Sequence, residues 1–342
     1  FKWEEHMKKI FILLTVVFAM LLTACGGSKE DTKETDTKEV KSENALNVGI
    51  VLSTGGLGDK SFNDSAYRGL TMAEEKLGIK FKYVEPASPS EDMQFLREFA
   101  ENNYDLIIGV GFLMKDSVEA VAKEHPNVKF AIIDEVIDAP NVTSLVFSED
   151  EGSFLVGALA AMMSKTNIIG FVGGMEVPLI KKFQSGYEQG AKYINPDIKV
   201  TILYTSGPNP FNDPVRGKES AIAEYNRGAD VIFHAAGGTG TGVIEGAKSK
   251  GIFAIGVDSN QDYVAPGTVL TSMIKNVDQA VFATVKDVKE GTFKSGVNRF
   301  GVANNGVGTS EFEFTKDIIG TEKLEKLKEI KAGIIDGSIK LK

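Results

Sequence analysis

The chain has few of the side chains on which metal sites and covalent catalysis depend. Its 342 residues include one cysteine, Cys25, and of its three histidines only His125 and His234 follow that cysteine. One cysteine cannot form an internal disulfide, and neither histidine stands in an HExxH or HxH spacing. A catalytic zinc site therefore has almost no ligands to draw on.

Positive charge and phosphate-binding loops are also scarce. The chain has 38 lysine and arginine residues against 47 aspartate and glutamate residues, which gives a net charge of −9. Nucleic-acid binding needs a basic surface that displaces counterions from phosphates, so we expect no nucleic-acid partner. Because the sequence contains neither a P-loop pattern nor GxGxxG, phosphate-loop nucleotide binding has no support, and we expect no cofactor.

A lipoprotein signal is the most informative feature near the N-terminus. Residues 7–25 read MKKIFILLTVVFAMLLTAC, with two lysines, then an apolar run of 13 residues, and a cysteine directly after Leu-Thr-Ala. A bilayer span needs about 20 apolar residues, so the pattern indicates a signal peptide over residues 7–24. We expect a diacylglyceryl thioether on Cys25 that anchors the protein to the extracytoplasmic face of the cell membrane. A secretory peptide without lipid attachment is the alternative.

Two further segments are expected to lie outside the folded body. Residues 1–6 precede Met7, and we interpret them as vector sequence or as the product of a misplaced start codon. Residues 25–45 hold the lipid-bearing cysteine and then mostly Lys, Glu, Asp, Thr and Ser, which cannot bury enough apolar surface to fold. We expect a disordered tether that holds the body about 25 Å from the bilayer.

The remaining chain alternates short β-rich runs with amphipathic segments. Apolar runs such as LIIGV and VIFHAA lack polar alternation, which is typical of parallel strands covered by helices on both faces. We predict an α/β fold of two doubly wound parallel-sheet lobes, joined by a hinge and separated by a ligand cleft. The predicted strands lie at residues 46–52, 79–84, 105–111, 128–134 and 142–147, and then at 167–173, 200–205, 230–235 and 253–257.

The boundary between the lobes is expected near Ser148, where the first complete series of strands and helices ends. Lobe 1 is predicted at residues 46–147 with a returning segment at about 271–302. Lobe 2 is predicted at residues 148–270 with C-terminal segments at about 303–342. Ligands of such sheets bind at the carboxyl ends of the strands, so the cleft between the lobes is the expected site.

Two phenylalanines stand in loops that follow predicted strands, one in each lobe. Phe62 lies in STGGLGDKSFN, a glycine-rich turn at a helix start, and Phe211 lies in SGPNPFNDP. The two rings can clamp a flat ligand when the lobes close, and stacking contributes about 1–3 kcal/mol per base. The alternative for Phe62 is a hydrophobic staple that packs on its own helix.

Three charged residues follow other strands of the two lobes. Asp134 and Asp258 end strands, and Lys275 follows the strand-like segment TSMI. A carboxylate at the carboxyl end of a parallel strand points into the cleft and accepts hydrogen bonds from vicinal hydroxyls, which favours a sugar or a nucleoside. Surface aspartates and a solvated lysine are the alternatives.

The glycine-rich loop at residues 235–242 nearly matches the tubulin-type GTPase signature, with Thr241 where serine or alanine would stand. Such a match is only a hypothesis without its structural context. The glycines more simply let backbone amides at a helix start approach a ligand closely.

A series of motifs in a fixed order relates the chain to a known family. The order is a lipobox, DKSFN, a long α/β body, FNDP, AAGGTGTG, GVDSNQ and TSMIKNVD. Together they resemble the basic membrane protein (BMP) family of substrate-binding lipoproteins, most closely its PnrA-like purine nucleoside receptors. The resemblance spans the mature chain and implies a type I periplasmic-binding-protein fold without enzymatic activity. It also implies a monomer that delivers adenosine, guanosine or inosine to an ABC permease.

The resemblance assigns a contact to each residue of the expected site. Asn260 replaces the aspartate common in the motif GVDSDQ but leaves Asp258 in place. The implied contacts are Phe62 and Phe211 on the two faces of the base, Asp59 and Asn63 at the base edge, and Asp134, Gly238, Asp258 and Lys275 at the ribose.

Three other functions stay open. A binding protein for a free sugar uses the same fold and would bind ribose tightly but not adenosine. A signalling or chemoreceptor lipoprotein would have no transport role. A nucleoside hydrolase or a tubulin-like GTPase is the third, but a hydrolase needs an acidic cluster that activates water, and the aspartates of this sequence stand singly.

Overall fold

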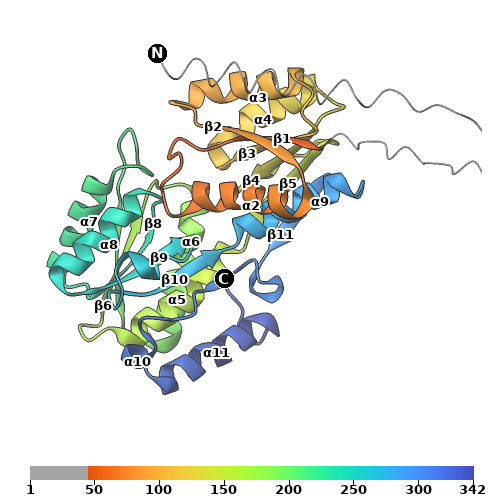
Figure 1. Ribbon diagram of the computed structural model, residues 1–342. Coiled ribbons are helices and arrows are strands. Elements are labelled where there is room, and N and C mark those ends of the chain that lie inside the picture. The colour runs from red at the N-terminus through yellow and green to blue at the C-terminus, as the bar shows by residue number, and fades with distance from the viewer. Residues whose placement is uncertain (1–44) are drawn as a thin grey trace, which may run out of the picture. The chain divides into compact units, whose positions relative to one another are not determined.

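Two β-sheets organise residues 45–342, the part of the chain that the structure describes (Figure 1). In this computed structural model these residues form one unit, with each sheet at the centre of one lobe. The predicted leader at residues 1–6, the signal peptide, Cys25 and the tether up to residue 44 lie outside the described residues.

Lobe 1 is built on a six-stranded sheet with the strand order β11-β5-β4-β3-β1-β2. All neighbouring strands in this sheet pair in parallel. Its members are β1 (Asn47–Val51), β2 (Lys80–Val84), β3 (Leu106–Val110), β4 (Lys129–Ile133), β5 (Val142–Phe147) and β11 (Gly296–Phe300).

Lobe 2 repeats this plan with the strand order β12-β10-β9-β8-β6-β7. Its strands pair in parallel except for β12, which runs antiparallel to β10. Its members are β6 (Ile168–Gly173), β7 (Lys199–Tyr204), β8 (Val231–Ala235), β9 (Phe253–Asp258), β10 (Val269–Lys275) and β12 (Val307–Thr309). The predicted fold of two parallel-sheet α/β lobes is therefore confirmed.

Helices cover both faces of the first sheet. Ile50 and Ile108 belong to the hydrophobic cluster that includes α2 (Phe62–Leu77) and α9 (Val277–Lys289). Their sequence neighbours Val51 and Ile107 belong to the opposite cluster, with α3 (Asp92–Glu101) and α4 (Lys115–Glu124). Full burial of such side chains contributes about 1.5–3 kcal/mol each, which explains why these strands are apolar throughout.

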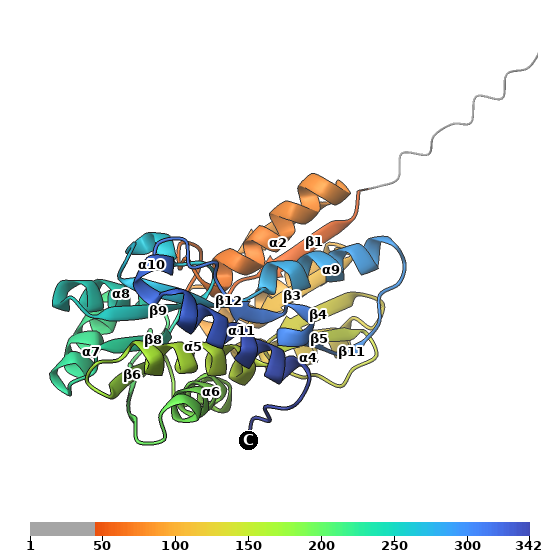
Figure 2. The ribbon, with the colours of Figure 1, turned by 90° about the horizontal axis from the view of Figure 1, so that it is seen from below.

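The second sheet is covered in the same way. On one face, α5 (Glu149–Met163) packs against α6 (Pro178–Ile194). On the other face, α7 (Pro214–Asn226) packs against α8 (Thr239–Lys250). The C-terminal helices are α10 (Lys316–Ile319) and α11 (Thr321–Ile335), and α11 lies along α5 (Figure 2).

Within residues 45–342 the chain passes between the lobes three times, at Ser148, at Asn276 and in the segment 301–306. The second crossing corrects the predicted return to lobe 1 at about residue 271. Strand β10 pairs with β9 and so belongs to lobe 2, and the chain returns only with α9, which packs against α2. Helix α8 begins at Thr239, within the glycine-rich segment at residues 235–242.

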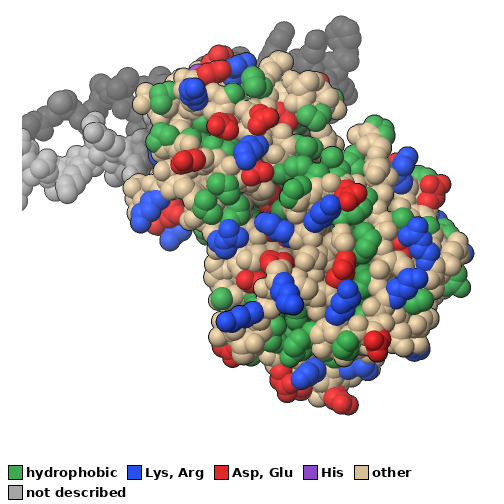
Figure 3. Space-filling model, turned by 180° about the vertical axis from the view of Figure 1, so that it is seen from behind, with side chains coloured by type: hydrophobic (Ala, Val, Ile, Leu, Met, Phe, Trp, Pro, Cys, Tyr) green, Lys and Arg blue, Asp and Glu red, His purple; other side chains and the backbone are tan. Residues whose placement is uncertain are grey.

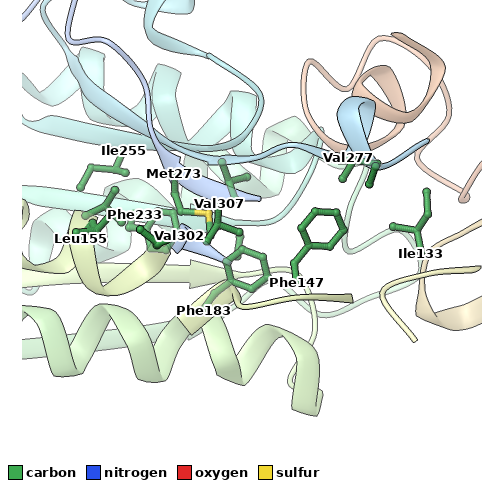
Figure 4. Packing of buried hydrophobic residues seen from close by; sticks show 14 of the residues in the cluster. Ile133, Phe147, Leu155, Phe183, Phe233, Ile255, Met273, Val277, Val302 and Val307 are labelled. Atoms are coloured by element: carbon green, nitrogen blue, oxygen red, sulfur yellow. The ribbon is translucent and has the colours of Figure 1, made fainter. Parts of the chain in front are cut away.

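The junction of the lobes is a packed hydrophobic core rather than a bare linker (Figure 4). Phe147 of β5, Phe183 of α6 and Met273 of β10 belong to one cluster of buried residues that extends through both lobes. The ring of Phe147 also stacks on Phe300 of β11, with 5.1 Å between the ring centroids. The strands next to the crossings therefore belong to one hydrophobic core that both lobes share.

On the face shown in Figure 3, acidic and basic side chains are interspersed, without a broad field of lysine and arginine. Among the described residues no helix is both long enough and apolar enough to span a bilayer.

Candidate ligand-binding site

A cavity lies between the lobes, at the carboxyl ends of the parallel strands. It encloses about 790 Å³ of space free of atoms, including solvent at its mouth. Loops after β1, β2, β3 and β4 form one wall, and loops after β6, β7, β8, β9 and β10 form the other. Seven of the eight predicted site residues line it, namely Asp59, Phe62, Asn63, Asp134, Phe211, Asp258 and Lys275.

The eighth predicted residue, Gly238, is not part of the cavity wall, where its neighbour Gly237 lies instead. Gly237 has a φ of 53°, a backbone conformation that favours glycine. Farther along the same segment, a Cβ on Gly242 would stand 1.8 Å from the carbonyl oxygen of Pro214. The tubulin-like glycine pattern thus combines a turn at the cavity with close packing of α8 against α7.

The start of α2 is held by the carboxylate of Asp59. Its two oxygens accept hydrogen bonds from the backbone amides of Ser61 and Asn63, both at 2.8 Å, and of Asp64 at 3.2 Å. The side-chain amide of Asn63 is a fourth donor, at 3.1 Å. Burial raises the pKa of Asp59, although the three backbone donors oppose it. Asp59 thereby fixes the turn that carries Phe62 to the cavity wall.

Four phenylalanines line the cavity, namely Phe62, Phe112, Phe183 and Phe211. Phe62, the first residue of α2, follows β1, and Phe211 lies in the loop after β7, so both lobes contribute. Phe112, which follows β3, was not predicted from the sequence; its ring centroid lies 6.4 Å from that of Phe211 in an edge-on arrangement. The sequence feature that could have indicated Phe112 is its place next to Gly111, directly after a buried strand.

Lys275 is the polar centre of the site and is 1% exposed. Its ammonium lies 2.6 Å from Asp134 and 3.2 Å from Glu149, and it faces the ring of Phe62 at 5.2 Å. Burial alone would lower the pKa of Lys275, but the carboxylates of Asp134, Glu149 and Asp258 outweigh it and raise that pKa above its usual value. The lysine is therefore a cation at neutral pH.

Among the residues around this cation that were not predicted from the sequence are Glu149 and Phe183. Glu149 is fully buried at the first position of α5, where an acidic residue is common for helix-dipole reasons alone. Phe183 lies 5.5 Å from the ammonium of Lys275, on the buried face of α6, where it looks like any other core residue of an amphipathic helix. Neither side chain has a local pattern that distinguishes it.

The carboxylates of Asp134 and Asp258 stand at the ends of facing strands with positive φ, 72° and 63°. Such strained backbone positions recur at binding sites. The hydroxyl of Ser61 in lobe 1 donates to Asp258 in lobe 2, at 2.5 Å, while Lys275 in lobe 2 contacts Asp134 in lobe 1. Each of the two carboxylates therefore takes part in one polar contact between the lobes.

Replacing Asp258 by asparagine is expected to stabilise the unliganded protein at pH 7. Burial, opposed by Lys275 and Ser61, raises the pKa of Asp258 to about 6. The folded state thus binds this proton more tightly than the unfolded state does, so stability falls as the pH rises from about 4 to about 6. Above that range the charged group carries a cost of about 1–3 kcal/mol, which asparagine avoids.

Urea unfolding of Asp258→Asn and the unchanged protein at pH 7 and pH 4.5 measures this difference. The gain should be largest at pH 7 and small at pH 4.5, where the wild-type carboxyl is protonated. The exposed Asp138, for which the same change to asparagine is expected to alter stability by less than about 0.5 kcal/mol, is the control. A variant that is less stable than wild type at pH 7 would contradict the assignment of Asp258 as a buried carboxylate whose charge destabilises the fold.

Comparison with known proteins agrees with this architecture. Residues 46–342 match the Bmp family, described as ABC transporter substrate-binding protein PnrA-like. The CD4+ T-cell-stimulating antigen of Listeria innocua is 38% identical, over 98% of each chain. The ABC transporter nucleoside-binding protein BmpA of Lactococcus lactis subsp. cremoris is 34% identical, over 97% of this chain and 98% of its own length.

A solved structure supports the same relationship. An ABC transporter system solute-binding protein from Aeropyrum pernix K1 superimposes with a TM-score of 0.81 and 30% identity, covering 86% of this chain and 92% of its own. The resemblance that the motifs indicated is thereby confirmed over the whole of the described body. The chain belongs to the Bmp family of PnrA-like ABC transporter substrate-binding proteins.

Proposed function

We propose that the cavity binds a purine nucleoside and that the protein delivers it to an ABC permease. The observation that carries this proposal is the division of the cavity into an aromatic part and a charged part. Phe62, Phe112 and Phe211 offer faces and edges to a flat ring. The charged part, with Asp134, Asp258 and Lys275, offers acceptors and a donor to sugar hydroxyls.

The proposed contacts follow this division. The base stacks between Phe62 and Phe211, and the ribose hydroxyls bind Asp134, Asp258 and Lys275, with Gly238 close by. Asn63 uses its carbonyl oxygen to accept from the backbone amide and the hydroxyl of Ser53. Its amide group donates one hydrogen to Asp59, which leaves the second hydrogen for an acceptor on the base.

A relative supports the choice of ligand. The Lactococcus protein, at 34% identity over nearly the full length of both chains, is named as nucleoside-binding. We extend that ligand class to this chain because its cavity has both the aromatic and the hydroxyl-binding groups that a nucleoside needs. We also propose that lipid on Cys25 holds the protein at the extracytoplasmic face of the membrane, where a monomer meets its permease.

Isothermal titration of the protein without residues 1–24 tests the ligand class. The protein is first unfolded and refolded to remove any carried ligand, and then titrated with adenosine, guanosine, inosine, cytidine and ribose. Purine nucleosides should bind more tightly than cytidine, since the larger ring system covers more of the phenylalanine faces. Heat with ribose but with none of the nucleosides would favour a sugar-binding protein, and heat with none of these compounds would favour a signalling role.

A further inference from the structure

One carboxylate in the cavity has a buried oxygen that lacks a hydrogen-bond partner among the described residues. Asp92, the first residue of α3, lines the cavity and is only 2% exposed. Its Oδ1 atom is buried and accepts no hydrogen bond from any residue of the described chain, 45–342. The other cavity carboxylates differ, because Asp59 has four donors and Asp134 contacts Lys275. Leaving a buried acceptor unsatisfied is costly, so the group needs an explanation.

The position of Asp92 in the fold separates it from the charged part of the site. It follows β2 through the short helix η1 (Pro89–Glu91), whereas Asp134 follows β4. In the first sheet, β1 and β3 lie between these two strands. Phe62 follows β1 and Phe112 follows β3, so the aromatic side chains stand between the two carboxylates. A ligand that places its sugar beside Asp134 and its base on the phenylalanines directs the far edge of the base toward Asp92.

We propose that Asp92 determines which purine is preferred, by accepting hydrogen bonds from N–H groups on the edge of the base. This inference rests on the proposed nucleoside-binding function. Guanine carries two adjacent donors, N1–H and the 2-amino group, which match the two oxygens of one carboxylate. Hypoxanthine offers only N1–H. Adenine places the acceptor N1 beside its 6-amino group, and an ionised carboxylate cannot donate to that acceptor.

The ionisation of Asp92 agrees with this role. Burial, with a smaller contribution from the charge of Glu91, raises the pKa of Asp92 to about 6. At pH 7.5 the group is therefore mainly a carboxylate that accepts hydrogen bonds. A site with a buried acceptor rejects ligands that leave it unpaired, so the order guanosine, inosine, adenosine is the expected order of affinity.

Calorimetric titration of the Asp92→Asn variant with guanosine, inosine and adenosine at pH 7.5 tests the inference. Asparagine presents one acceptor and one donor, the arrangement that pairs with adenine rather than guanine. Guanosine should bind at least about tenfold more weakly than to the wild type, and adenosine should bind as tightly or more tightly. Asp116→Asn is the matched control: Asp116 stands in the first turn of the neighbouring helix α4 but is exposed, so all three affinities should be unchanged.

A second measurement needs no variant, since the wild-type protein should prefer guanosine to adenosine by about tenfold or more. An equal loss for all three nucleosides in Asp92→Asn, or no loss for guanosine, would overturn the role of Asp92 and leave the proposed function intact. A wild-type preference for adenosine would do the same. If the wild-type protein binds no nucleoside at all, the proposed function fails, and this inference fails with it.

Discussion

Replacing Lys275 by methionine is expected to destabilise the folded protein by about 3–5 kcal/mol at pH 7. Methionine keeps the length and much of the volume of the side chain but has no charge. Among the described residues, Lys275 is the only cation that contacts both Asp134 and Glu149. The carboxylates of Asp134, Glu149 and Asp258 would then share a buried space without a compensating charge. Breaking a buried ion pair from one side leaves such a charge, and this accounts for the size of the effect.

Urea unfolding measures this loss, and Lys182→Met is the matched control. Lys182 lies 3.6 Å from Glu149, but its side chain is 47% exposed, so its removal should cost at most about 1 kcal/mol.

Acid should partly restore the stability of the Lys275→Met variant. Burial already raises the pKa values of Asp134 and Glu149 above their usual range, and loss of the lysine raises them further. The folded variant then takes up protons as the pH falls from 7 toward 5, which increases its free energy of unfolding. Equal costs for the two lysines, or a cost that does not change with pH, would contradict this assignment.

Replacing Phe62 or Phe211 by alanine is expected to weaken purine nucleoside binding by about 1–3 kcal/mol each, which corresponds to about 5-fold to 150-fold in Kd. Each ring is half-buried and lines the cavity from a different lobe, so each change removes one face of the proposed stack. Because neither ring is fully enclosed by the core, the variants should remain folded.

Calorimetry with inosine measures both variants beside Phe314→Ala. Phe314 is 38% exposed and does not line the cavity, so its loss should leave the affinity unchanged. Ribose supplies a second control, because a free sugar gains nothing from stacking, and any weak ribose binding should be similar in all four proteins. Inosine affinity that is unchanged in both cavity variants would rule out the stacked base.

The sequence was sufficient to predict residues whose role follows from their place at a strand end. Asp134 and Asp258 end buried apolar runs, and Lys275 ends another, so their convergence on one cleft follows from parallel-sheet topology. The two predicted phenylalanines follow the same logic, since each comes shortly after a strand. The family resemblance added Asp59 and Asn63, whose contacts with the α2 turn no spacing rule would indicate.

Three of the missed residues, Glu149, Asp92 and Phe183, lie in helices rather than at strand ends. Glu149 and Asp92 both begin helices, where acidic residues are common because they interact favourably with the helix dipole. Phe183 lies within a helix whose apolar face has the ordinary spacing of a core. Only tertiary structure distinguishes these side chains from residues without a site role, since it is the neighbouring strands that bring them to the cavity or to Lys275.

The misplaced boundary at about residue 271 has a similar cause. The segment from Val269 to Lys275 has the composition of a buried strand, and either sheet could accept such a strand. Pairing of Ser272 with Gly256 and of Met273 with Val257 places it in lobe 2. That pairing also carries Lys275 to the same edge as Asp258, so the element that was assigned to the wrong lobe supplies the charged centre of the site.

The affinity of the refolded protein for inosine relative to ribose tests the central claim most directly. Two aromatic faces at about 1–3 kcal/mol each should make inosine bind at least about 30-fold more tightly than ribose in the same calorimeter cell. That result would support a site in which the phenylalanines hold a base and the charged residues hold its sugar. Ribose binding as tight as inosine binding would contradict it, because the aromatic part of the cavity would then contribute nothing to recognition.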